Sequence, residues 1–100
     1  MRTNGTSLTL EERQDMMEKI LAVAQDRLLQ HKLRGVKFKQ IATATGLPKT
    51  RVSEIFKRVY ISKKALSLLI EHQYLDFTDI EAAGLTDAQL VAVRAFTGQV

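Results

Sequence analysis

Apolar residues recur with a helical period along the first third of the chain. In the segment TLEERQDMMEKILAVAQDRLLQHKLRG they fall at i, i+3, i+4, i+7 and i+11, which are Met17, Ile20, Leu21, Ala24 and Leu28. Thr9, with Glu12 three residues later, has the spacing of a capping box, and Gly35 is a stop signal. This pattern predicts a flexible N-terminus, residues 1–8, followed by a long amphipathic helix that packs one face on a core.

Beyond Gly35 the apolar pattern breaks into shorter pieces. It predicts a helix over residues 37–44, a tight turn at residues 45–47 and a helix over residues 48–58 that Pro48 opens. Three more start signals follow: Ser62, Thr78 with Glu81, and Thr86 with Gln89. Gly84 should end the short helix that Thr78 starts. No segment alternates as a strand would, so we predict an all-α single domain of five or six helices over residues 9–100.

Two segments of the chain share a local pattern. GLPKTRVSEI and GLTDAQLVAV both begin with Gly-Leu and carry apolar residues six and nine positions after the glycine. This similarity predicts two helical hairpins that are held together by the same kind of contacts.

Length and composition narrow the class of protein. The chain has 100 residues, 45% of them hydrophobic, which is enough for one modest core. It has no cysteine, so neither a disulfide framework nor a thiolate metal site is expected. No apolar run approaches the roughly 20 residues that span a bilayer, and the N-terminus lacks the apolar stretch of a secretory signal. We therefore expect a cytoplasmic protein without a membrane partner.

Charge is unevenly distributed along the chain. The net charge is +4, but residues 32–64 alone hold ten Lys and Arg and a single acid, Glu54. The segments before and after this block are both net acidic. A solvated surface normally mixes both signs, so the block favours a face that binds a polyanion, above all a nucleic acid.

Residues 41–56, IATATGLPKTRVSEIF, satisfy the steric demands of a helix-turn-helix. Ala42 supplies the small side chain needed where the two helices cross, and Gly46 tolerates the positive φ of the turn. The buried face of the second helix is expected to hold Val52, Ile55 and Val59, opposed by Ile41 and Leu47. The outward stripe then holds Lys49, Ser53 and Lys57, with Thr50 beside them.

The segment QIATATGLPKTRVSEIFKR resembles the helix-turn-helix of the lambda repressor and Cro-like family of phage and plasmid regulators. The matching positions are Ile41, Ala42, Gly46, Leu47, Val52 and Ile55. Three positions depart from the family pattern. Thr45 stands where the family usually has an apolar residue, Phe38 stands where a polar residue is common, and Pro48 opens the second helix unusually early. The resemblance implies that helix 48–58 enters the major groove, where its early residues meet base edges.

The same resemblance assigns roles to individual residues. Base contacts are expected from Lys49, Thr50, Ser53 and Lys57. Phosphate contacts are expected from Lys37, Lys39, Gln40, Arg51, Arg58, Ser62, Lys63 and Lys64. For Glu54 we favour an ion pair with Arg58, four residues later on the same helix, over a contact with a cytosine amino group.

The residues offer little for catalysis or metal binding. His31 and His72 lack a spaced partner for a metal or a nucleophile, and we interpret them as surface or helix-end histidines. Asp76, Asp79 and Glu81 have no accompanying Gly-rich phosphate loop, so capping and solvent contact explain them. We expect no enzymatic activity, no metal and no cofactor.

Two classes of function remain open. The basic block favours a sequence-specific DNA-binding transcriptional regulator, such as a repressor of phage or plasmid origin. The acidic C-terminal helices leave room for a protein-interaction module, such as an antitoxin or an inhibitor. Because one helix-turn-helix reads few base pairs, a regulator should bind double-stranded DNA at an inverted-repeat operator as a homodimer. The expected dimer interface is a C-terminal apolar stripe: Phe77, Leu85, Leu90, Val93 and Phe96.

Overall fold

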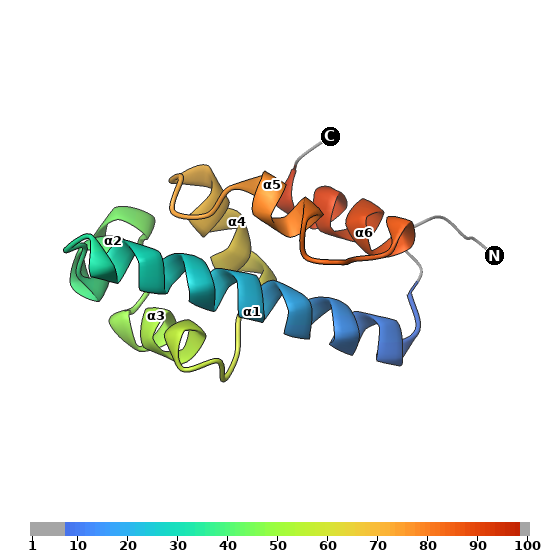
Figure 1. Ribbon diagram of the computed structural model, residues 1–100, viewed down its shortest axis with the longest axis horizontal. Coiled ribbons are helices and arrows are strands. Elements are labelled where there is room, and N and C mark those ends of the chain that lie inside the picture. Colours follow the sequence, from blue (N-terminus) through green and yellow to red (C-terminus); the bar gives the residue numbers. More distant parts are fainter. Residues whose placement is uncertain (1–7, 99–100) are drawn as a thin grey trace.

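Six helices make up residues 8–98, the part of the chain that the computed structural model describes (Figure 1). They are α1 (Leu10–Leu33), α2 (Phe38–Thr45), α3 (Lys49–Phe56), α4 (Lys63–Glu71), α5 (Phe77–Glu81) and α6 (Asp87–Thr97). These residues contain no strand, which confirms the predicted all-α fold. The predicted flexible N-terminus lies outside the described residues, apart from Leu8, whose side chain packs against the core. None of these helices combines the length and the apolar character needed to cross a membrane.

The longest helix organises the molecule. α1 runs along the longest of the three dimensions, which measure 47 × 22 × 20 Å (Figure 1). At the C-terminal end of α1, α2 and α3 pack on each other, and α3 also packs on α1. α5 and α6 pack on α1, and α6 also packs on α4. The basic α2–α3 pair therefore lies at one end of the long axis, and α6 lies beside the first half of α1.

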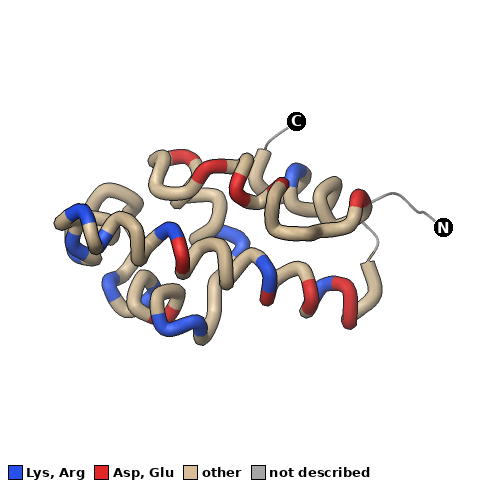
Figure 2. The backbone as a smooth tube through the Cα atoms, viewed as in Figure 1, with Lys and Arg blue, Asp and Glu red and all other residues tan. Residues whose placement is uncertain are grey.

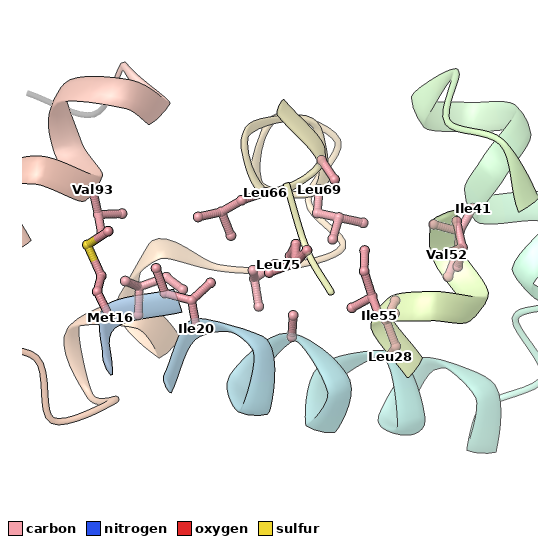
Figure 3. Packing of buried hydrophobic residues seen from close by; sticks show 14 of the residues in the cluster. Met16, Ile20, Leu28, Ile41, Val52, Ile55, Leu66, Leu69, Leu75 and Val93 are labelled. Atoms are coloured by element: carbon pink, nitrogen blue, oxygen red, sulfur yellow. The ribbon is translucent and has the colours of Figure 1, made fainter. Parts of the chain in front are cut away.

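One hydrophobic core follows α1 from end to end (Figure 3). Its side chains from α1 are Met16, Ile20, Ala24 and Leu28, each at most 2% exposed. A stripe of every fourth residue winds slowly around a helix of 3.6 residues per turn, so its start faces α6 and its end faces α3. This winding corrects the predicted stripe: Met16 is buried in place of Met17, while Met17 and Leu21 are half-buried at the edge of the core.

Most helix starts agree with the predicted caps, and one does not. The capping box of Thr9 and Glu12, the Ser62 cap and the capping box of Thr86 and Gln89 are confirmed. The predicted box of Thr78 and Glu81 is wrong, because α5 starts earlier, at an Asp76 cap whose carboxylate accepts from the Thr78 N–H at 3.2 Å. Aspartate is a stronger cap than threonine, so the earlier start is preferred.

A buried polar side chain joins α6 to the start of α1. Gln89 is 1% exposed, and its amide nitrogen donates to the Glu12 carbonyl oxygen at 2.9 Å and to the Asp15 carboxylate at 3.1 Å. Its amide oxygen accepts from the Thr86 N–H at 2.9 Å. Hydrogen bonds from Gln89 and Lys19 lower the pKa of the Asp15 carboxyl below its ordinary value. Because these hydrogen bonds offset the desolvation of the buried amide, it links the two helices without leaving an unpaired polar group.

Candidate nucleic-acid interface

The α2–α3 pair has a short turn built around one glycine. Gly46 has φ 79° and ψ 8°, and its N–H donates to the Ala42 carbonyl oxygen at 2.9 Å. Ala42 is buried, as the predicted crossing of the two helices requires. The positive φ predicted for Gly46 is thus confirmed, and the turn from Gly46 to Pro48 connects two helices that pack on each other.

The three departures from the family pattern each have a structural explanation. Thr45 is buried, and its hydroxyl donates to the Ile41 carbonyl oxygen at 2.7 Å and accepts from the Leu47 N–H at 3.3 Å. The Phe38 ring packs on the Phe56 ring with centroids 4.8 Å apart. Pro48 is the N-cap of α3, with ψ 145°, and the first helical residue is Lys49. The buried Thr45 hydroxyl therefore has both a hydrogen-bond acceptor and a donor nearby, and the Phe38 ring packs on another aromatic ring.

α3 is shorter than the predicted helix of residues 48–58, because it ends at Phe56. Val52 and Ile55 are buried on its inner face, as predicted, and Lys49 and Thr50 are exposed, with Ser53 half-buried. Val59 does not belong to the inner face: it lies beyond the helix and is 66% exposed. Gln25 of α1 donates to the Phe56 carbonyl oxygen at 2.9 Å, which supports the end of α3 at this point.

The backbone reverses direction at the end of α3. Arg58 has φ 63°, its N–H donates to the Ile55 carbonyl oxygen, and the Val59 N–H donates to the Glu54 carbonyl oxygen at 2.9 Å. These are the two hydrogen bonds of a Schellman motif, in which glycine normally occupies the position of Arg58. Arg58 is therefore not on the helix.

This ending changes the expected partner of Glu54. Its carboxylate pairs with Arg51 at 3.0 Å, three residues earlier, and the predicted pair with Arg58 is wrong because Arg58 has left the helix. The Arg51 side chain remains 55% exposed. Lys57 is the exposed C-cap of α3, so it stays next to the outward face that holds Thr50.

Basic residues occupy the starts of three consecutive helices. Lys37 and Lys39 lie at the start of α2, Lys49 and Arg51 at that of α3, and Lys63 and Lys64 at that of α4. None of these first turns contains an acid. Figure 2 shows Lys and Arg gathered at the α2–α3 end and along the loop after α3, whereas Asp and Glu gather on the first half of α1 and around α5. The start of a helix carries a partial positive charge, so lysine and arginine side chains there are electrostatically unfavourable. A bound anion would compensate both positive charges.

A hollow with a volume of about 490 Å³ lies between the ends of α1, α2 and α3. It is lined by Lys32, Gly35, Val36, Lys37, Phe38, Lys39 and Lys49. The fold thus brings together three of the predicted contact residues and adds Lys32, which the sequence did not single out. The Lys32 ammonium lies 5.3 Å from the Phe38 ring centroid and 5.0 Å from that of Phe56. Its place in the basic block was the only signal available for it.

The other predicted phosphate contacts have local partners as well. Gln40 accepts from the Lys37 N–H at 2.7 Å, and the Ser62 hydroxyl accepts from the Ala65 N–H at 3.0 Å, so both side chains act as caps. Lys63 lies with its ammonium 5.3 Å from the Phe96 ring centroid, away from the hollow. The α4 cations therefore form a separate basic region beyond the loop after α3.

The predicted C-terminal stripe packs largely within its own chain. Val93 has no exposed surface and belongs to the core, so it is corrected from an interface residue to a core residue. Phe77, Leu85, Leu90 and Phe96 are half-buried against the same core. The Arg94 guanidinium also covers the Phe77 ring at 5.0 Å. The apolar side chain that α6 leaves open is Val91, 46% exposed.

The two histidines and the acids of α5 make contacts that support the fold. His31, in the last turn of α1, donates from Nε2 to the Tyr74 carbonyl oxygen at 2.8 Å, and His72 is the exposed C-cap of α4. Asp79 forms a two-oxygen ion pair with Arg27 of α1, at 2.7 and 2.6 Å, and Glu81 pairs with Arg94 at 2.7 Å. Within residues 8–98, no group of His, Asp and Glu is arranged to hold a metal ion.

Comparisons with protein-family models, with curated proteins and with solved structures found no match to this chain. The interpretation of the α2–α3 pair therefore depends on its geometry, its charges and the sequence resemblance described above.

Proposed function

We propose that this protein is a sequence-specific DNA-binding transcriptional regulator in which α2 and α3 act as a helix-turn-helix. In this proposal α3 enters the major groove, and Lys49, Thr50, Ser53 and the neighbouring Lys57 face the base edges. The geometry that supports it is an α3 with a buried apolar face and an outward face of short polar and basic side chains.

The observation that carries the proposal is the placement of basic residues at the starts of α2, α3 and α4. A phosphate at these positions interacts with both the lysine ammonium and the free N–H groups of the helix start. The cations that disfavour the isolated helices therefore become favourable when a DNA backbone is bound. The Lys32 hollow extends this surface from α2 to the end of α1.

Selection of bound sequences from a random pool of duplex DNA tests the function and identifies the operator. A selected duplex should bind with an affinity that falls steeply with salt, with a slope in log–log form of about 0.9 per phosphate contact. We expect an inverted repeat if two copies bind together. If the protein selects no sequence and shows no salt-dependent binding, the proposal is overturned and a protein-interaction module is favoured.

Single substitutions separate base contacts from phosphate contacts. Lys49→Ala and Lys57→Ala should weaken binding to the selected site by about 1–3 kcal/mol and reduce the preference for it over random DNA. Arg58→Ala should weaken binding to all sequences alike. Lys19→Ala is the matched control, because Lys19 pairs with Asp15 at 2.9 Å on the first half of α1, away from α2 and α3.

A further inference from the structure

An apolar groove lies between the first half of α1 and the loop that joins α3 to α4. Its volume is about 520 Å³. One wall comes from α1 and the other from the loop and the first residue of α4: Gln14, Met17, Glu18 and Leu21, facing Val59, Tyr60, Ile61 and Lys63. In Figure 1 this loop emerges below α1, whereas α5 and α6 lie above it. The loop thus lies on a different side of α1 from α5 and α6, and Lys63, at the start of α4, has its ammonium 5.3 Å from the Phe96 ring centroid of α6.

Exposed apolar side chains gather at this groove. Val59 is 66% exposed and Tyr60 is 54% exposed, and both project from the loop wall. Leu10, 66% exposed, precedes Gln14 by four residues and Met17 by seven, so it lies on the same face of α1. Large apolar side chains beside an open apolar groove are typical of an interaction surface.

The two walls of the groove carry opposite charges. On the α1 wall Glu18 is exposed, and on the loop wall Lys63 is exposed. The ion pairs formed within residues 8–98 do not join these walls. The acidic wall of one molecule therefore suits the basic wall of another.

We infer that this groove is a dimer interface, in which Val59 and Tyr60 of a second copy of the chain pack on Met17 and Leu21. A two-fold interface uses the same patch on both molecules, so the patch must be complementary to itself. This patch contains both a pair of apolar projections and an apolar hollow, and both an acidic and a basic wall. A different protein would need only one member of each pair, so the combination favours a second copy.

This groove is more exposed to solvent than the C-terminal stripe that was predicted as the dimer interface. Val93 is buried in its own chain and the Arg94 guanidinium covers Phe77, whereas Val59 and Tyr60 are 66% and 54% exposed. The loop of Val59 and Tyr60 follows directly after α3, so a two-fold interface there relates the two copies of α3 by the same axis. That arrangement suits an inverted repeat, but the dimer itself does not depend on DNA.

Sedimentation velocity of the full chain without DNA tests this interface, over concentrations from about 1 to 500 μM. We expect a reversible dimer for the wild type. Tyr60→Glu should raise the dimer dissociation constant at least about a hundredfold, since it places a charge in the apolar contact. Tyr60→Ser gives a second measurement in which no charge is added. Val91→Glu, at an apolar position on α6 that is 46% exposed against 54% for Tyr60, is the matched control and should leave the dimer intact.

A charge exchange tests the proposed complementarity of the walls. Glu18→Lys and Lys63→Glu should each weaken the dimer about fivefold to tenfold, and the double variant should recover most of the loss. A wild type that is monomeric throughout this range overturns the inference, and so does a dimer lost in Val91→Glu but kept in Tyr60→Glu. A Tyr60→Ser variant that dimerises as tightly as the wild type would also overturn it, because Tyr60 would then contribute nothing to the contact. None of these outcomes decides whether the protein binds DNA, since the selection experiment detects monomer binding to a half-site as well.

Discussion

The helices of this protein start in two different ways. α1, α5 and α6 have an acid in the first turn and a capping box, whereas α2, α3 and α4 start with lysines and no acid. An acid at a helix start contributes about 0.3–1 kcal/mol, and a cation there is unfavourable by a similar amount. The charges at the helix starts therefore stabilise α1, α5 and α6 but not α2, α3 and α4, and under the proposed function a DNA phosphate would compensate the second group.

The same contrast holds between the two hairpins that were predicted from the shared Gly-Leu pattern. Gly46 has φ 79° and Gly84 has φ 84°, and each precedes a half-buried leucine and the N-cap of a helix. The turns are therefore physically alike. Their second helices differ on the outward face, which is basic and polar on α3 but carries the exposed apolar Val91 on α6.

Charge reversal at the starts of α2 and α3 should have the largest effect. It should lower DNA affinity and raise the stability of the fold. In Lys39→Glu combined with Lys49→Glu, we expect DNA affinity to fall by about a hundredfold or more, because a cation that faces phosphates and a cation that faces base edges both become acids. The melting temperature should rise by several degrees, as about 1 kcal/mol corresponds to roughly 4–8 °C in a domain of this size. Fluorescence anisotropy and thermal circular dichroism measure the two quantities.

Asp87→Lys is the control for this reversal, because Asp87 lies in the acidic first turn of α6. Its melting temperature should fall by a few degrees, and its DNA affinity should not decrease. A charge-reversed α2–α3 variant with a lower melting temperature than the wild type would show that the lysines stabilise the fold and would remove the contrast.

Valine at either turn glycine should destabilise the fold by about 1–3 kcal/mol, because a β-branched residue is strained at positive φ. A Cβ atom placed on Gly46 or Gly84 would meet no heavy atom within 4 Å outside the adjacent residues, so the loss is expected from the backbone conformation. Chemical denaturation of Gly46→Val and Gly84→Val should give similar free energies of unfolding. Gly46→Asn should lose less, since asparagine tolerates this conformation, and an unchanged stability in Gly46→Val would contradict the turn.

Arg58 and Gln73 offer a matched pair with a smaller effect. Both have positive φ, at 63° and 65°, at the ends of α3 and α4. Replacing either with glycine should raise stability by about 0.5–1 kcal/mol, because glycine relieves the left-handed backbone strain at a small entropic cost. Only Arg58→Gly should also weaken DNA binding, and it should do so for all sequences. Equal DNA affinities of the two variants would remove Arg58 from the proposed interface.

The smallest expected effect concerns pH and the acidic half of the molecule. Because Gln89 and Lys19 lower the pKa of Asp15 in the folded chain, its contribution to stability is present above the ordinary aspartate pKa of about 4. That contribution is lost as the pH falls through the lower folded pKa. Comparing the unfolding of the wild type and Asp15→Asn between pH 6 and pH 2 should show a smaller decrease with acid for the variant. Parallel curves would exclude this role for Asp15.

Features that depend on a few neighbouring residues were predictable from the sequence. The caps at Thr9, Ser62 and Thr86 and the turn at Gly46 were predicted correctly, because each uses hydrogen bonds or backbone angles within about four residues. The outward placement of Thr50 was also predictable, since the helical period alone places it on the side of α3 opposite Val52 and Ile55.

Contacts between distant segments decided the rest. Gln89 and Glu12 are 77 residues apart, and Arg27 and Asp79 are 52 apart, so no local pattern indicates that they meet. The burial of Met16 instead of Met17 depends on which helix crosses α1 at that point. The sequence by itself therefore determined the helices, their charges and the turn of the α2–α3 pair, through interactions between near neighbours. Only the tertiary structure decided which faces are buried, where α3 ends and which cations share the hollow, because these follow from packing between helices far apart in the chain.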